Sequence, residues 1–226
     1  MVRALQGAGQ GQTAGGGLRE RKKQRTRQLI ADTAAALFAE RGYEHVAIID
    51  VARAAEVAEQ TVYNYFPTKE GLVLDRDVGL RDRLSELVRN RRPGTSPAAA
   101  IRSEALSFAE QIRTLPAEQV RGGLGYLAAV SSTMRRLSLE MTDRHADALA
   151  TALLETTSDT TAPLAKVQAT ALAWVFQTIT DETGRRARHG DSPSEIATAL
   201  RPIVAVVVDD LERWLGPAAS DHHNKG

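Results

Sequence analysis

The stretch "TVYNYFPTKEGL", residues 61–72, places two tyrosines, an asparagine and a phenylalanine within six residues. Aromatic residues make up only 4% of the chain, so their concentration here indicates a specialised segment. Side chains in a helix advance by about 100° per residue, which puts Val62 and Phe66 on one face. The opposite arc holds Gln60, Thr61, Tyr63 and Asn64, with Tyr65 at its edge. The pattern predicts a short helix with one buried face and one polar face.

Two further apolar stripes precede this helix. One begins at Leu29 and ends before Gly42, and the other covers residues 48–55. The third helix is expected over residues 59–65, because Pro67 disfavours helical geometry at Phe66. Two short helices joined by a few residues and braced by a longer one form a helix-turn-helix.

The polar face of the third helix suits the major groove of DNA. Amide, hydroxyl and phenol groups bond base edges and phosphates, and threonine methyls and tyrosine ring edges pack on thymine methyls. Lys69 is expected at the start of the next helix, where its ammonium and the free main-chain amides can hold a phosphate. The sequence therefore favours a DNA-reading helix.

Positive charge gathers at the N-terminal end, although the net charge is only +1. Residues 19–27, "RERKKQRTR", carry six basic side chains against one acid. Such a run indicates a local anionic partner, either nucleic acid or a membrane surface, and the alternative is a solvated tail.

The segment "LIADTAAALFAERGYEHVAIIDVARAAEVAEQTVYNYFPTKEGLV" resembles the DNA-binding domain of the TetR family of one-component transcriptional regulators. The resemblance covers roughly residues 25–73 and implies an obligate homodimer with a ligand-binding C-terminal domain. By analogy the operator contacts are Thr61, Tyr63, Tyr65 and Lys69, beside Asn64 on the outward arc. Glu59 and Gln60 would supply sequence preference, and Glu59 has the alternative role of capping its own helix. Arg25 and Thr26 would approach the DNA backbone.

Three residues depart from the family pattern. Ala47 and Ala58 stand where hydroxyl side chains often cap the second and third helices, and Glu56 occupies a turn position often held by glycine. A lost cap costs on the order of 1 kcal/mol, and a left-handed non-glycine residue roughly 1–2 kcal/mol.

The remaining chain also reads as helical, so the expected fold is all-α. A fourth helix is expected from about Thr68 to Arg92, linking the helix-turn-helix domain, residues 19–73, to a helical ligand-binding and dimerisation domain, residues 74–216. Residues 1–18 and 217–226 are expected to be disordered tails.

Two apolar stripes in the last two helices predict either the core of a monomer or, as the resemblance implies, a four-helix dimer interface. The expected interface residues are Val167, Ala171, Trp174, Val175, Ile196, Leu200, Val204, Val207, Val208 and Leu211. A two-fold axis would place two reading helices about 34 Å apart, or somewhat more, on a palindromic operator.

A pocket for a small lipophilic effector is expected on the strength of the resemblance. The candidate lining residues are Phe108, Tyr126, Met134, Met141, Trp174 and Phe176, each of which has simple core packing as its alternative. The expected biochemical role is a ligand-released repressor; the alternative is an effector-independent or activating DNA-binding protein.

No catalytic motif, cofactor site or metal site is expected. The five histidines are scattered without metal-ligand spacing, and the absence of cysteine excludes disulfides and thiolate zinc. No apolar run is long enough for a membrane helix, and the N-terminus lacks the apolar stretch of a signal peptide. A cytoplasmic, non-enzymatic protein is expected. An all-α enzyme or interaction module with an incidental basic tail is the remaining alternative.

Overall fold

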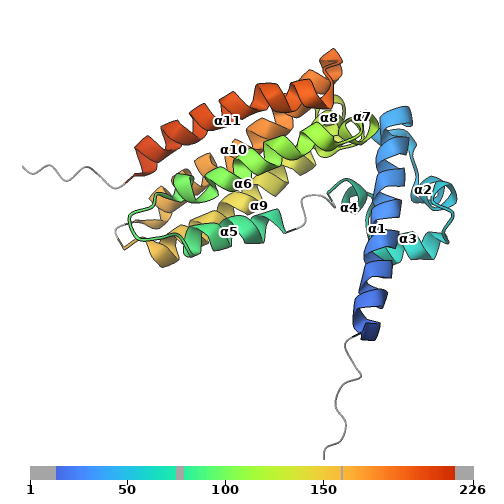
Figure 1. Ribbon diagram of the computed structural model, residues 1–226, viewed down its shortest axis with the longest axis horizontal. Helices are drawn as coiled ribbons and strands as arrows, with labels where there is room; N and C mark the ends of the chain where they lie inside the picture. Colours follow the sequence, from blue (N-terminus) through green and yellow to red (C-terminus); the bar gives the residue numbers. More distant parts are fainter. Residues whose placement is uncertain (1–13, 75–78, 159, 217–226) are drawn as a thin grey trace, which may run out of the picture.

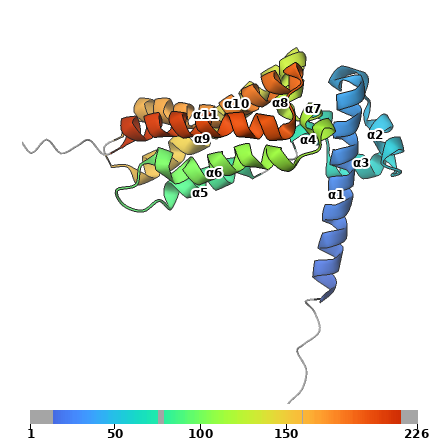
Figure 2. The same ribbon diagram turned by 45° about the horizontal axis from the view of Figure 1, so that its top comes forward.

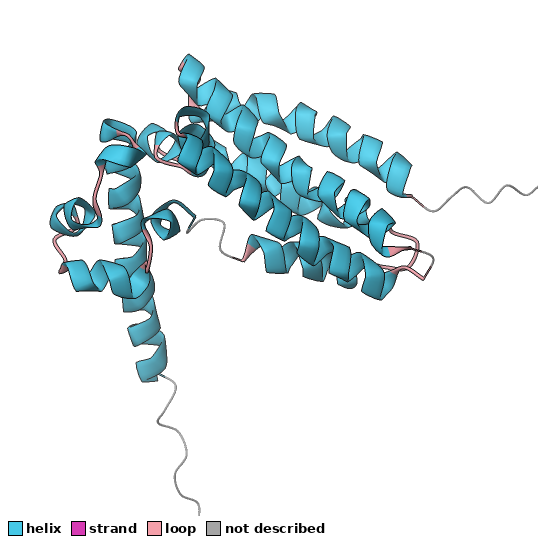
Figure 3. Cartoon of the chain, turned by 180° about the vertical axis from the view of Figure 1, so that it is seen from behind, coloured by secondary structure: helices cyan, strands magenta, loops and turns pink. Residues whose placement is uncertain are grey.

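The computed structural model describes residues 14–74, 79–158 and 160–216. Within these ranges the chain is helical and has no strand, which confirms the all-α prediction (Figure 3). The helices are α1 (Ala14–Arg41), α2 (Ile48–Ala54), α3 (Glu59–Tyr65), α4 (Lys69–Leu74), α5 (Leu80–Arg89), α6 (Pro97–Gln111), α7 (Ala117–Arg121), α8 (Leu124–Val130), α9 (Ser132–Thr156), α10 (Ala162–His189) and α11 (Pro193–Leu215). Single 3₁₀ turns lie at Tyr43–His45 and Ile112–Thr114.

The helices form two bodies set across each other (Figure 1). Helices α5, α6, α9, α10 and α11 run side by side as a bundle, and α1 stands across one end of it with α2, α3 and α4 (Figures 1 and 2). The short helices α7 and α8 lie at that same end of the bundle, beside α1. They therefore provide the contact between the two bodies.

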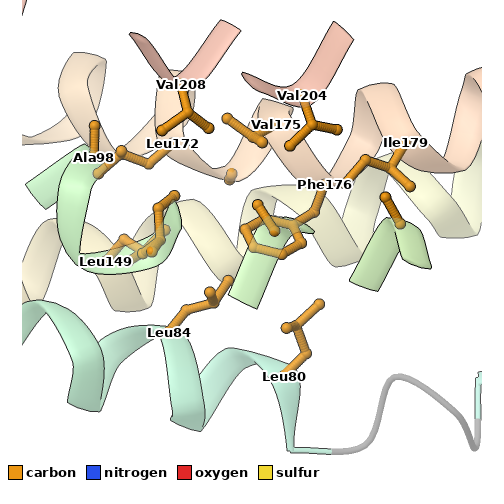
Figure 4. Close-up of a cluster of buried hydrophobic side chains, with 14 of the residues drawn as sticks. Leu80, Leu84, Ala98, Leu149, Leu172, Val175, Phe176, Ile179, Val204 and Val208 are labelled. Atoms are coloured by element: carbon orange, nitrogen blue, oxygen red, sulfur yellow. The ribbon is translucent and has the colours of Figure 1, made fainter. Parts of the chain in front are cut away.

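The bundle core is built from aliphatic stripes that meet between the helices. Figure 4 shows Leu80 and Leu84 of α5 opposite Phe176 of α10, with Val204 and Val208 of α11 closing the other side. The β-branched run at 203–208 is helical, because its successive turns bury Val204 and Val208 against α6 and α10. Ser192 and Glu195 begin α11 with a reciprocal capping box.

The core of the N-terminal body includes residues from the other body. Phe38, Val51, Val62 and Phe66 are buried in one cluster with apolar residues of α4. The same cluster also contains Leu124, Leu127 and Ala128 of α8 and Met134 of α9. Helix α8 thus completes the core beneath the helix-turn-helix.

The predicted N-terminal tail is wrong for residues 14–18, because α1 begins at Ala14. The basic run that follows, residues 19–27, consists mostly of arginine and lysine, which are good helix formers, and α1 extends from this run back to Ala14. Hydrogen bonds four residues apart support it, from Gln24 to Glu20 and from Thr26 to the Lys22 carbonyl. Residues 1–13 and the C-terminal tail, 217–226, lie outside the described residues.

The predicted linking helix over residues 68–92 is also wrong as a single element. Helix α4 ends at Leu74, and α5 begins at Leu80 after Gly79. Gly79 has a φ of 86°, a left-handed conformation that interrupts a helix. Of the helices in the described ranges, none combines the length and apolar character needed to cross a bilayer.

Candidate DNA-binding surface and ligand cavity

Helix α3 has the bounds that the sequence predicts, and its two faces separate as expected. Val62 and Phe66 are almost completely buried in the cluster that contains Phe38 and Val51. Burying such side chains favours folding by about 1.5–3 kcal/mol each. The apolar face therefore fixes the orientation of α3 against α1 and α2.

Arg27 provides a second attachment that the sequence analysis missed. Its guanidinium donates a hydrogen bond of 3.2 Å to the carbonyl oxygen of Tyr65 and lies 4.7 Å from the centroid of the Phe66 ring. The residue belongs to the basic run, and only its place on α1, one turn before the buried Ile30, distinguishes it from its neighbours. Arg27 ties the C-terminal end of α3 to α1.

The outward arc of α3 carries the reading surface, defined here as Glu59, Gln60, Tyr63 and Asn64. All four are exposed, and Gln60 donates a 3.1 Å hydrogen bond to Asn64 one turn later. Thr61 and Tyr65 lie half-buried at the edges of this arc. The structure brings together the residues expected to face DNA bases.

Lys69, at the start of α4, is held by an aromatic ring. Its ammonium lies 4.1 Å from the centroid of Tyr43, which packs on Phe38. Burial lowers the pKa of Lys69, while the carboxylates of Glu44 and Glu70 oppose that shift. Burial, and next the neighbouring Glu70, raises the pKa of the Tyr43 phenol, which keeps the ring neutral. Lys69 is thus a partly oriented cation.

On α1, Arg25 is exposed and Thr26 is half-buried, donating to the Lys22 carbonyl at 3.1 Å. Arg19, Arg21, Lys22 and Lys23 are exposed along the same helix. Figure 1 shows this end of α1 projecting past α3. The N-terminal part of α1 is therefore an exposed, positively charged helix that extends past α3.

The departures from the family pattern have structural consequences. Ala47 and Ala58 are the N-cap residues immediately before α2 and α3, and neither provides a side-chain cap. Asp50 partly compensates, since it accepts a 2.9 Å hydrogen bond from the main-chain amide of Ala47. Glu56 has a φ of 55°, so the turn between α2 and α3 is left-handed although no glycine is present.

We expect Glu56→Gly to raise the free energy of unfolding by about 0.5–1 kcal/mol. Relief of left-handed strain exceeds the extra chain entropy that glycine brings to the unfolded state. Thermal unfolding followed by circular dichroism measures the change. Glu56→Ala is the matched control, since it removes the same carboxylate and keeps the strain; an equal gain in both variants would contradict the explanation.

A cavity of about 430 Å³ lies where α1, α4, α6, α7, α8 and α10 meet. Phe108, Ile112, Val120, Leu124 and Ile179 provide apolar walls, and Gln28 of α1 lies at its edge. This volume suits a small organic molecule. The cavity therefore reaches from the bundle to the N-terminal body.

Most of the predicted pocket residues lie elsewhere. Phe108 lines the cavity, and Phe176 is buried behind it in an edge-to-face contact with 5.7 Å between ring centroids. Met134 and Tyr126 pack with the N-terminal core, Met141 borders a hollow near Gly79, and Trp174 is exposed. Aromatic residues and methionines were poor markers because core packing uses them equally. The glutamines and threonines that line the cavity follow no sequence pattern that would identify them as pocket residues.

The predicted dimer interface also needs correction. Val175, Ile196, Leu200, Val204 and Val208 are at most 2% exposed, because they fill the core of their own bundle. They are not available to a second copy. Ala171, Val207 and Leu211 are half-buried, and Val167 and Trp174 are exposed.

An outward apolar face remains on the last two helices. Leu164, Val167 and Trp174 on α10 are 42%, 57% and 43% exposed, and Val206 and Trp214 on α11 are 58% and 51% exposed. The α10 residues follow at spacings of three and seven, which places them on one side of the helix. Periodicity in the sequence identified the buried stripe as the dimer interface. The outward apolar face is the alternative surface for such a contact.

Comparison with known proteins identifies the N-terminal body. The family model of bacterial regulatory proteins of the tetR family matches residues 30–75. The HTH-type transcriptional regulator TcmR of Streptomyces glaucescens is 31% identical over 110 residues, 49% of this chain and 49% of its own length. The uncharacterised HTH-type regulator YuxN of Bacillus subtilis is 27% identical over 127 residues, 54% of this chain and 44% of its own length. The chain spans about half the length of these relatives.

The whole fold has counterparts among solved structures. NalD, the secondary repressor of the MexAB-OprM multidrug efflux pump in Pseudomonas aeruginosa, matches with a TM-score of 0.56 and 19% identity, covering 87% of this chain and all of NalD. At this identity the likeness shows the fold alone. The match at residues 30–75, together with the geometry of α1–α3, identifies the N-terminal body as a DNA-binding domain of the TetR family of bacterial regulatory proteins.

Proposed function

We propose that this protein is a transcriptional regulator that binds a palindromic DNA operator as a homodimer and is released by a small lipophilic effector. The observation that carries the proposal is the reading surface. Its exposed polar side chains lie on a helix fixed by Val62, Phe66 and Arg27 in a TetR-family DNA-binding domain. Such a protein acts as a repressor by occupying its operator, needs no catalytic chemistry and works in the cytoplasm.

Dimerisation is supported by the outward apolar face. Val167, Trp174 and Val206 are large apolar side chains that remain exposed in the monomer. A two-fold contact there is self-complementary and gives the two reading surfaces the symmetry of a palindrome.

Effector release requires a ligand that binds one arrangement of the reading surfaces better than another. A tenfold loss of operator affinity needs a difference of about 1.4 kcal/mol. The cavity beside α1 is the natural site for this ligand. Because α4 and α5 are separate helices, the proposal does not use one rigid linking helix as the lever.

Selection of DNA from a random duplex pool tests the proposal. We expect the wild-type protein to enrich a two-fold symmetric sequence, with half-sites about one or more helical turns apart, and to sediment as a dimer. Specific binding should exceed binding to scrambled DNA by about a thousandfold or more. Enrichment of no sequence, with equal salt-dependent binding to every duplex, would show that the protein acts only as a basic surface.

A further inference from the structure

The cavity has a distinctive chemical lining. None of its lining side chains is charged, and the polar ones are the three glutamines and two threonines Gln28, Gln111, Gln119, Thr180 and Thr183. The rest of the wall is apolar or glycine. A charged ligand would lose water here without meeting an opposite charge on the wall, which costs several kcal/mol.

Any hydrogen bond between a ligand and the two threonine hydroxyls must use the hydroxyls as acceptors. Thr180 donates its hydrogen to the carbonyl of Phe176 at 3.0 Å, and Thr183 donates to the carbonyl of Ile179 at 2.7 Å. Each oxygen then has only lone pairs for a further partner. An apolar ligand with no donor would leave these acceptors without a bond, so a hydroxyl or N–H group on the ligand is favoured.

Two of the cavity's glutamines bond to the same carboxylate on α1, and one of these bonds connects the two bodies. The carboxylate of Asp32 on α1 accepts hydrogen bonds from Gln28, at 2.9 Å, and from Gln119 of α7, at 3.0 Å. Asp32 is not part of the cavity wall, whereas both glutamines are. A ligand that takes the Gln119 amide as its partner therefore competes with a bond between the bodies.

Close backbone packing beside this bond limits independent movement of α7. A Cβ at Gly122, directly after α7, would lie 1.9 Å from the carbonyl oxygen of Ala35 on α1. The two backbones are thus in direct contact. Because there is no free space between them, a shift of α7 toward α1 must move α1 as well. Helix α1 also holds α3, so the movement reaches the reading surface.

We propose that the cavity binds a neutral, largely apolar ligand carrying a hydrogen-bond donor, and that this ligand acts on the reading surface by changing the Gln119–Asp32 contact. The effect on DNA rests on the proposed function. The ligand class rests on the cavity alone, so the two are tested separately.

The ligand class is tested with two probes that share the same ring systems. N-phenyl-1-naphthylamine is neutral with one N–H donor, and 8-anilinonaphthalene-1-sulfonate adds a fixed negative charge. We expect fluorescence titration to give the neutral probe a Kd at least about tenfold lower than that of the sulfonate. The cation tetraphenylphosphonium should not displace the neutral probe. Equal binding of the sulfonate, or displacement by the cation, would overturn the assignment.

Two variants place the neutral probe in the cavity. Thr180→Phe fills space beside the wall and should abolish binding, and Thr180→Val keeps the shape, removes the acceptor and should weaken binding about fivefold or more. Thermal unfolding checks that both variants fold. Unchanged binding in both would show that the probe sits on another apolar surface and would overturn the site.

The coupling between the cavity and DNA binding is tested with the variant Asp32→Ala. The control variant is Glu40→Ala, because Glu40 is an exposed acid near the end of α1. In wild type and control we expect the neutral probe to weaken operator binding about tenfold; in Asp32→Ala probe binding should persist without this effect. Release that survives in Asp32→Ala, or no release from wild type with the probe bound, would overturn the coupling. Probe binding as expected in a protein with no sequence-specific DNA affinity would refute the proposed function and leave the ligand class standing.

Discussion

Replacing Gly184 by alanine is expected to lower the free energy of unfolding by about 2–3 kcal/mol. A Cβ at this position in α10 would lie 2.0 Å from the carbonyl oxygen of Gly125 in α8 and 3.3 Å from the Cβ of Ala129. The obstacle is main chain, so α8 and α10 must separate, and such overpacking costs 1–3 kcal/mol or more. The gain in helix propensity, about 1 kcal/mol, offsets only part of this cost.

Denaturant unfolding followed by far-ultraviolet circular dichroism measures the effect. Gly17→Ala is the matched control, because Gly17 also lies within a long helix and an added Cβ meets nothing within 4 Å. That variant should be unchanged or more stable by up to about 1 kcal/mol. Equal behaviour of the two variants would mean that α8 and α10 do not touch through their backbones at this point.

Tyr63→Ala is expected to weaken binding to the selected operator by about 10- to 100-fold. Tyr63 is 41% exposed at the centre of the reading surface, and loss of a base-edge or phosphate contact costs roughly 1–3 kcal/mol. Because its side chain contributes little to the core, thermal stability should stay close to that of wild type. Fluorescence anisotropy with labelled operator and scrambled duplexes measures both affinities.

Arg25→Ala provides the contrast. Arg25 is an exposed cation on α1, so its loss should weaken operator and scrambled DNA alike and make the salt dependence less steep. Tyr63→Ala should instead reduce the preference for operator over scrambled DNA. If Tyr63→Ala lowered both affinities equally, Tyr63 would contribute no sequence reading.

The helix-turn-helix was predictable because its signals are local. Pro67 fixes the end of α3, and the separation of Val62 and Phe66 from Tyr63 follows from helical periodicity within one short segment. The family pattern marked Glu56 as a departure at a turn position often held by glycine, and its φ of 55° shows that the turn is left-handed rather than rebuilt. Where neighbouring residues decide the conformation, the sequence was sufficient.

The bundle was harder because periodicity identifies an apolar face without identifying what covers it. Val204 and Val208 mark the inner face of α11, and that stripe looks the same whether α6 and α10 or a second copy packs on it. The exposed Val206 follows a less regular pattern. The break at Gly79 was missed because one glycine among helix-forming residues is often tolerated.

The cavity and the bond beside it depend on tertiary structure. Asp32 and Gln119 are 87 residues apart, and both are common, unremarkable surface residue types. Only the crossing of α1 and α7 brings them together, next to Gly122. Contacts of this kind have no local pattern from which they can be predicted.

The burial of Leu124, Leu127 and Met134 in the N-terminal core limits how this protein can be recombined with its relatives. A chimaera joined after Leu74 would pack a foreign α1 to α4 on the α8 of this chain. The side chains of that α8 belong to a core with Phe38, Val62 and Phe66. The unit of exchange that keeps this core intact is discontinuous: α1 to α4 together with α7, α8 and the start of α9. Exchanging these helices together keeps the contacts between α8 and the N-terminal core. The DNA preference of the new N-terminal body would then be exchanged together with the α7 and α8 contacts beside it.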